Sequence, residues 1–302
     1  INTNKYFDID RNLNNSNQFQ DAFKDGKVKI VLVIPSDFSE NLSLQKKANL
    51  QMIIDGTDIN LGNQISNYLQ NIILDFYKNQ AKNSTQSYNV TPEIRMLYNP
   101  QLKGAPNFVP GVMALILLIV CVMMTAIAIV KEKETGTMEI LLVSPMKPSF
   151  VIIAKAVPYF ILSMLIVLVI LILSYFLLDL PIKGSLILLL FVSTIFILTN
   201  LLIGILISIF VKTQQQAMLI SLIATMLPTL MLSGFMFPIE NMPIPLQVVS
   251  NIIPAKWYYI MIKNIMIKGT GIAIIWKPFL ILSGMMMILF IIAVKKFKIR
   301  LE

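Results

Sequence analysis

The sequence has no histidine and only one cysteine, and these two absences exclude much of enzyme chemistry. Without histidine the chain lacks the usual general base, a Ser–His–Asp triad and any histidine-bearing metal site. The single cysteine, Cys121, excludes disulfides and thiolate clusters, and its place in an apolar run favours a packing role. Neither a GxxxxGK[ST] phosphate loop nor a GxSxG motif occurs in the 302 residues. We therefore expect no catalytic residue, no metal site and no cofactor in this chain.

Acidic residues and arginine are also missing from five long apolar runs, at about residues 111–130, 156–178, 185–211, 216–237 and 271–294. The chain is 56% hydrophobic and 14% charged, which is typical of a membrane protein. A helix needs about 20 apolar residues to cross roughly 30 Å of hydrocarbon. The runs contain no Asp, Glu or Arg, and their only lysine, Lys277, lies near an end. The sequence thus predicts a polytopic α-helical membrane protein and disfavours ion-coupled carriers, which keep ionisable groups within their spans.

The basic residues are unevenly distributed. Eleven of the 25 basic and ten of the 16 acidic residues lie in residues 1–110, so most of the net charge of +9 belongs to the remainder. Nine basic residues fall in the 131–155 loop, at Lys212 and in the C-terminal tail, against five on the other side. Because cytoplasmic loops are enriched in Lys and Arg, we expect the 131–155 loop and the C-terminus in the cytoplasm and residues 1–108 outside. This pattern indicates membrane topology, and we expect no nucleic-acid partner.

Residues 1–108 have the pattern of an extracytoplasmic α+β domain, followed by a transmembrane domain over residues 109–302. Strands are predicted at 27–35, 49–55 and 93–100, and helices after Ser16, after Ser36 and over Ile59–Lys82. Because an outer domain needs a leader or an upstream span, we expect a further span before residue 1, which would give six natively. The protein is then expected in the bacterial cytoplasmic (inner) membrane.

Small polar residues recur at near-helical spacing on the third and fourth runs. They are Ser193, Asn200, Gly204 and Ser208, then Ser221, Thr225, Thr229 and Ser233. One interpretation is close helix packing through small residues and interhelical hydrogen bonds, which we favour. The other is a substrate path or a seam between two copies, to which Asn200, Gly204, Ser208, Thr225, Thr229 and Ser233 would contribute.

Between the first two runs lies KEKETGTMEILLVSPMKPSF, residues 131–150. Lys131–Glu134 end the first run, Gly136 permits a turn, and Thr137 can cap a short helix with Glu139 in its first turn. Met138, Leu141 and Leu142 share one face of that helix, and Pro145 ends it. The segment is either an interfacial anchor or a docking element for a cytoplasmic partner.

The stretch from Lys131 to Tyr159, KEKETGTMEILLVSPMKPSFVIIAKAVPY, resembles the permease subunits of type 2 ATP-binding-cassette (ABC) exporters, whose pattern there is E-[KR]-E-x-GT-x-E-x-LL-V-[ST]-P. Leu232–Gly269 is similar to the segment before their last span. Val31–Leu42 is similar to a motif of the subgroup with a large extracellular domain after the first span. The chain departs from the family in lacking that first span and in having Lys133 where Arg is frequent.

The resemblance implies that residues 131–155 form a coupling segment on a separate cytoplasmic P-loop ATPase, which would bind the ATP and Mg. It also implies a second permease copy or a related permease. Glu132, Glu134 and Glu139 would face or brace the ATPase, and the full docking set is Glu132, Glu134, Gly136, Thr137, Met138, Glu139, Leu141, Leu142 and Pro145. The chain itself would not be an enzyme.

Residues 238–270 are interrupted by prolines and rich in aromatic residues, which predicts a re-entrant or interfacial outer segment. We expect an outer gate there that includes Gly234, Pro238, Pro254, Trp257 and Tyr258. The predicted function is export of a hydrophobic or amphipathic substrate such as a drug or lipid. The alternatives are a membrane-anchored receptor or scaffold whose outer domain binds a ligand, and a passive channel, which the apolar spans disfavour.

Overall fold

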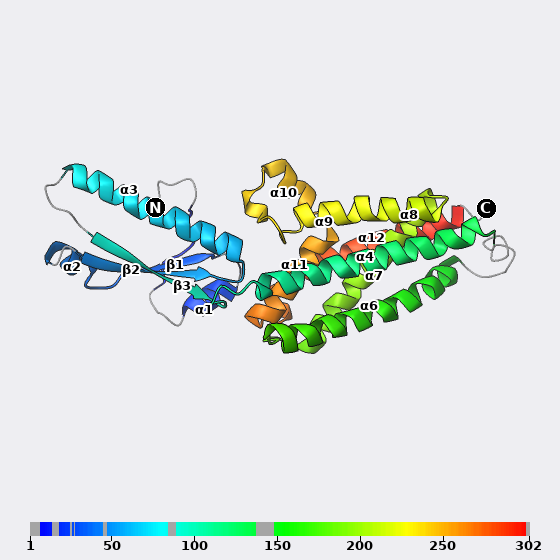
Figure 1. The fold of residues 1–302 in the computed structure, drawn as a ribbon, viewed down its shortest axis with the longest axis horizontal. Helices are drawn as coiled ribbons and strands as arrows, with labels where there is room; N and C mark the ends of the chain where they lie inside the picture. Colours follow the sequence, from blue (N-terminus) through cyan, green and yellow to red (C-terminus); the bar gives the residue numbers. More distant parts are fainter. Residues whose placement is uncertain are drawn as a thin grey trace. The chain divides into compact units, whose positions relative to one another are not determined.

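The computed structural model describes residues 7–13, 18–24, 26, 28–44, 47–83, 89–136 and 148–299. The chain divides into two units, Ile1–Gly104 and Ala105–Glu302 (Figure 1). Each unit is described separately below.

The first unit contains a three-stranded sheet in the order β1-β2-β3. Its elements are α1 (Gln18–Lys24), β1 (Ile30–Val33), α2 (Phe38–Leu44), β2 (Lys47–Asp55), α3 (Ile59–Asn83) and β3 (Asn89–Leu97). β1 pairs antiparallel with β2, and β2 pairs parallel with β3. Parallel neighbours need a crossover, which α3 supplies. These strands and helices lie within a few residues of the ranges that the sequence predicts.

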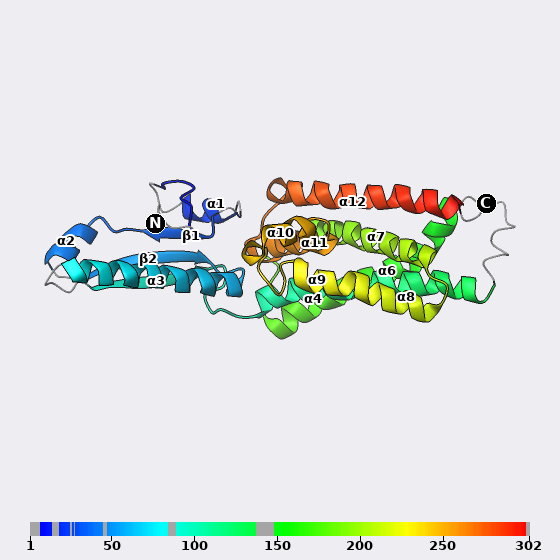
Figure 2. The same cartoon turned by 90° about the horizontal axis from the view of Figure 1, so that it is seen from above.

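The two faces of this sheet carry different helices, as the alternation of side chains along a strand requires. Ile53 and Val31 pack with Phe23 of α1. Ile54 is fully buried and lies beside Gly62 of α3, on the opposite face. The helix α3 runs along the sheet in both views (Figures 1 and 2).

The carboxylates Asp55 and Asp58 shape the turn between β2 and α3. Asp55 Oδ1 accepts hydrogen bonds from the backbone N and the hydroxyl of Thr57, and Asp58 Oδ1 accepts one from the backbone N of Asn60 at 3.1 Å. A Cβ on Gly56 would lie 2.9 Å from the carbonyl oxygen of Leu97, so only glycine fits there. The carboxylates stabilise a turn and the start of a helix.

The second unit is a helical bundle with five helices long and apolar enough to cross a membrane, which confirms the predicted number of spans. They are α4 (Ala105–Glu134), α6 (Pro148–Leu178, spanning from Ala154), α7 (Leu186–Phe210), the continuous run Gln214–Leu232, and α12 (Ile272–Ile299, spanning to Lys296).

The helices α4 and α7 form the centre of the bundle. About half of the residues in their most apolar stretches are buried (50% and 56%), against 22% in α6 and 11% in α12. α4 packs against α6, α7 and the first half of the run Gln214–Leu232. α12 lies at one edge of the bundle and the run Gln214–Leu232 at the other (Figure 2). The exposed sides of the outer helices are apolar, as contact with lipid requires.

The fourth span is not a uniform helix. It consists of α8 (Gln214–Ser221), a π-helical turn η1 (Leu222–Met226) and α9 (Leu227–Leu232). Pro228 has no N–H to give to the preceding turn, which accounts for the local widening. The helix ends at Leu232, before the expected end at Phe237, because Gly234 takes a left-handed φ of +84°.

The segment that follows α9 is broken into short pieces. They are the 3₁₀ turn η2 (Ile239–Asn241), α10 (Ile244–Ser250), α11 (Pro254–Lys263) and the π-helical turn η3 (Asn264–Lys268). Among the described residues, no candidate span falls in this segment. Pro254 lies at the start of α11, where a missing N–H costs nothing, and Gly269 ends η3 with φ +67°.

Candidate functional site

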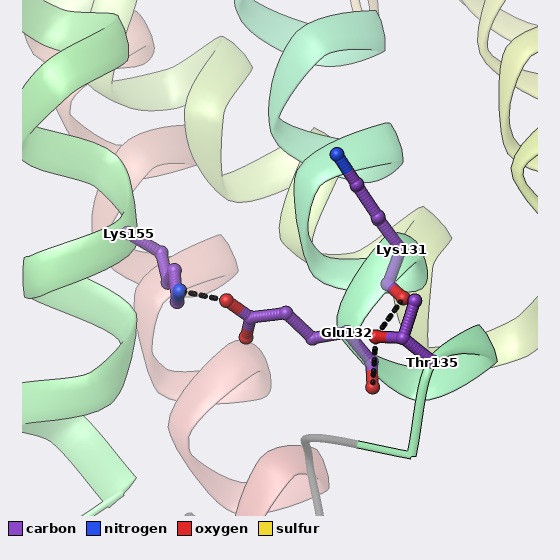
Figure 3. Close-up of polar contacts among 4 residues, drawn as sticks. All are labelled: Lys131, Glu132, Thr135 and Lys155. Atoms are coloured by element: carbon purple, nitrogen blue, oxygen red, sulfur yellow. Dashed lines mark hydrogen bonds and ion pairs between the residues drawn. The ribbon is translucent and has the colours of Figure 1, made fainter.

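The charged end of α4 is compact and capped. The hydroxyl of Thr135 donates to the carbonyl oxygen of Lys131 at 2.9 Å, and Gly136 leaves the helix with a left-handed φ of +76°. Figure 3 shows the side chain of Lys131 pointing away from that of Glu132. The chain therefore turns out of α4 at Gly136, where the sequence predicts a turn.

Glu132 forms an ion pair with Lys155 of α6 (Figure 3). Both side chains are only partly exposed. Glu132 lies before residues 137–147 in the sequence, and Lys155 lies after them. The ion pair therefore joins the end of α4 to the start of α6.

The next two residues, Lys133 and Glu134, contact the turn between α7 and α8, one at the end of α7 and the other at the start of α8. Lys133 Nζ donates to the carbonyl oxygen of Ser208, in the last turn of α7. Glu134 Oε2 accepts from the backbone N of Gln214 at 3.3 Å and from its side-chain Nε2 at 2.8 Å, at the start of α8. A cation thus lies at a helix C-terminus and an anion at a helix N-terminus, the arrangement that helix dipoles favour. Three consecutive charged residues connect α4 to α6, α7 and α8.

Of the predicted docking residues, the structure therefore places Glu132 and Glu134 in contacts with this chain's own helices and Gly136 in the turn after α4. The others lie outside the described residues: Thr137, Met138, Glu139, Leu141, Leu142 and Pro145. Docking on an ATPase stays a prediction for the whole set.

The polar residues of α7 lie inside the bundle, where Gly204 permits close contact with α4. A Cβ on Gly204 would be 2.6 Å from the carbonyl oxygen of Val122 and 3.0 Å from the Cβ of Thr125. Asn200 Nδ2 donates to the carbonyl oxygen of Phe196 at 2.9 Å, and the Ser208 hydroxyl donates to that of Ile205 at 2.6 Å. These contacts favour the interpretation as helix packing.

The corresponding residues of the fourth span behave similarly. The Thr225 hydroxyl donates to the carbonyl oxygen of Ser221 at 2.6 Å, while Thr229 and Ser233 are buried. Within the described part of the chain, the buried oxygens Thr125 Oγ1 and Asn200 Oδ1 have no hydrogen-bond partner. A substrate path along these residues stays a prediction.

Tyr258, predicted for the outer gate, is fully buried between helices. Its hydroxyl lies 2.9 Å from the Ser193 hydroxyl of α7, and its ring stacks on that of Phe196 with centroids 4.0 Å apart. Trp257 Nε1 donates to the carbonyl oxygen of Asn251 at 2.9 Å. The other predicted gate residues lie at breaks in the helices: Gly234, Pro238 and Pro254. Tyr258 therefore anchors α11 on α7.

Lys256 holds the connection between α10 and α11. Its Nζ donates to the hydroxyl of Ser250 at 2.9 Å and to Asn251 Oδ1 at 2.7 Å. Burial lowers the pKa of this ammonium, while the negative charge of Glu240 acts in the opposite direction.

A second polar cluster on α11 is absent from the sequence predictions. Asn107 Oδ1, in the first turn of α4, accepts hydrogen bonds from the Tyr259 hydroxyl and, at 2.9 Å, from Lys263 Nζ. Lys263 Nζ also donates to the Tyr259 hydroxyl at 3.1 Å. The only sequence signal is the four-residue spacing of Tyr259 and Lys263, which puts both on one helix face.

The sequence profile of a family described as "ABC-2 family transporter protein" matches residues 1–295. The chain is 32% identical over 268 residues to the "Probable multidrug ABC transporter permease YbhS" of Escherichia coli (strain K12), covering 87% of this chain and 71% of that protein. It is 33% identical over 261 residues to the "Probable multidrug ABC transporter permease YbhR" of the same strain (85% and 71%). It is 30% identical over 284 residues to that strain's "Inner membrane transport permease YhhJ" (90% and 74%).

Proposed function

The chain belongs to the ABC-2 family of transporter proteins, and on this basis we propose that it exports its substrate with energy from a separate P-loop ATPase. It is a multi-pass membrane permease, and the predicted membership of the ABC-2 permease family is confirmed, whereas the subgroup with a large extracellular domain stays a prediction. ATP and Mg would bind to the partner, since this sequence has no phosphate loop.

The observation that supports this proposal best is that Glu132, Lys133 and Glu134, at the end of α4, bond to α6, α7 and α8 respectively. These residues border residues 137–147, the segment we propose as the docking surface for the ATPase. Force applied to that segment would reach α6, α7 and α8 as well as α4, because each is bonded to one of the three charges. A mere interfacial anchor would not require such contacts.

The substrate that we propose is hydrophobic or amphipathic. Two relatives are named as probable multidrug permeases. In addition, the five predicted apolar runs of this sequence contain a single charged residue, Lys277. Apolar walls would interact well with drug-like or lipid-like molecules. We propose further that two copies, or this chain and a related permease, form the path.

We also propose a topology for the chain. The first unit, Ile1–Gly104, would lie outside the cytoplasmic membrane as in the subgroup with a large extracellular domain, and the charged end of α4 would lie inside. The bias of nine basic residues against five supports this orientation. The outer segment from Pro238 to Thr270 would then form the outer gate.

Replacing Glu134 with lysine tests the docking surface. The native full-length protein is purified in mild detergent, and the bound proteins are identified by mass spectrometry. We expect a P-loop ATPase with the wild type and its loss in Glu134→Lys, since the new cation would face the N-terminus of α8 and displace the end of α4.

The matched control is Glu240→Lys, which makes the same charge change at an exposed carboxylate of the outer segment and should retain the ATPase. Equal recovery of the ATPase with Glu134→Lys and wild type would contradict the docking role. A stable membrane protein with no ATPase under any condition would favour the receptor or scaffold alternative.

A further inference from the structure

The helix α4 has polar attachments at both of its ends. Its 30 residues are continuous from Ala105 to Glu134. The inner attachment is the set Glu132, Lys133 and Glu134, and the outer one is Asn107. At about 1.5 Å per residue the two lie about 38 Å apart. α4 therefore links the proposed docking segment to the outer segment through a single helix.

The outer attachment joins α4 to α11. One acceptor, Asn107 Oδ1, takes hydrogen bonds from both the Tyr259 hydroxyl and Lys263 Nζ, and Lys263 Nζ also lies 5.0 Å from the centre of the Tyr259 ring. An ammonium bound to an amide oxygen and an aromatic face makes a stronger contact than a neutral hydrogen bond. A shift or rotation of α4 would have to break both bonds or move α11 with it.

The same end of α4 also contacts the chain that follows α9. A Cβ on Gly111 would overlap the ring of Phe235, so this ring packs directly on the backbone of α4. Phe235 in turn makes an edge contact with Tyr259, with centroids 6.1 Å apart. The first turns of α4 thus touch the chain just before the broken outer segment and the helix α11 within it.

We propose that Asn107 is a positioning residue that couples movement of α4 to the outer segment, so that a change at the docking segment alters the outer side of the transport path. This inference rests on the proposed function. Apolar packing between two helices tolerates sliding, whereas two bonds to one amide oxygen fix the register. Asn107 is the group that makes α11 follow α4.

The test compares Asn107→Leu with Asn107→Asp in the full-length permease reconstituted with its ATPase. The leucine has the same branched arrangement of side-chain heavy atoms but no acceptor, whereas the aspartate keeps an oxygen for both donors. We expect the complex with Asn107→Leu to hydrolyse ATP at the wild-type rate. It should export about tenfold less substrate per ATP, since a bond to a charged donor is lost. Asn107→Asp should match the wild type in both measurements.

A second variant, Lys263→Met, removes the donor and leaves α4 unchanged, and it should show the same fall in export per ATP. Wild-type export per ATP in Asn107→Leu would overturn the role of Asn107. A parallel fall of export and ATP hydrolysis in all three variants would overturn it too, because it would indicate a general folding defect. Failure of the proposed function would instead appear in the wild type, as absence of any ATP-driven export, and would overturn both.

Discussion

Replacing Lys155 with glutamate is expected to reduce ATP-driven export about tenfold, equivalent to about 1.4 kcal/mol. The change would put two carboxylates against each other where Glu132 and Lys155 now form an ion pair. Repulsion would separate α4 from α6, and the proposed docking segment, residues 137–147, would lose its fixed ends. Because the pair is partly exposed, screening by water and salt limits the effect to this order.

The charge swap Glu132→Lys/Lys155→Glu separates this interaction from loss of either side chain. It should restore most of the export, since the pair is re-formed with its signs exchanged. The matched control is Lys131→Glu, because Lys131 is exposed and points away from Glu132 (Figure 3). Export that stays equally low in the single variant and the swap would show that the ion pair is not what matters.

Replacing Gly204 with leucine is expected to prevent formation of the native bundle. Even a Cβ at this position would lie 2.6 Å from the backbone oxygen of Val122, and that oxygen cannot rotate away. Leucine adds three more carbons to this contact between the two central helices, so we expect a cost above about 3 kcal/mol. The measurement is the yield of monodisperse protein by size-exclusion chromatography after extraction in detergent.

The control for this prediction is Gly284→Leu on α12. A Cβ at Gly284 meets no described atom within 4 Å, and the residue is exposed, so the same change should leave the yield near that of the wild type. If Gly204→Leu also gives a wild-type yield, the close approach of α7 to α4 is not a requirement of the fold.

The spans and the strands of the first unit could be predicted because they depend on short-range patterns. Apolar runs without acidic residues or arginine give the five spans, and β-rich runs ending at turn residues give the three strands. The turn at Gly136 follows in the same way, since a charged run ending in glycine marks the end of a helix. In each case the signal lies within a few consecutive residues.

The polar contacts that define the site could not be predicted, because their partners are far apart in the chain. Asn107 meets Lys263, and Lys133 meets the backbone of Ser208, across sequence separations that no local pattern reveals. Spans that are apolar on all sides also give no indication of which face is buried. For this reason Tyr258, which resembles an interfacial aromatic residue in the sequence, proves to be fully buried against α7.

The most direct test of an ATP-driven exporter is transport by inside-out membrane vesicles that contain the permease and its ATPase. The measurement is the accumulation of amphipathic fluorescent dyes with ATP and with a non-hydrolysable analogue. We predict accumulation that requires ATP hydrolysis and both proteins. Dye movement that is equally fast without ATP, or without the ATPase, would contradict this account and indicate a passive channel.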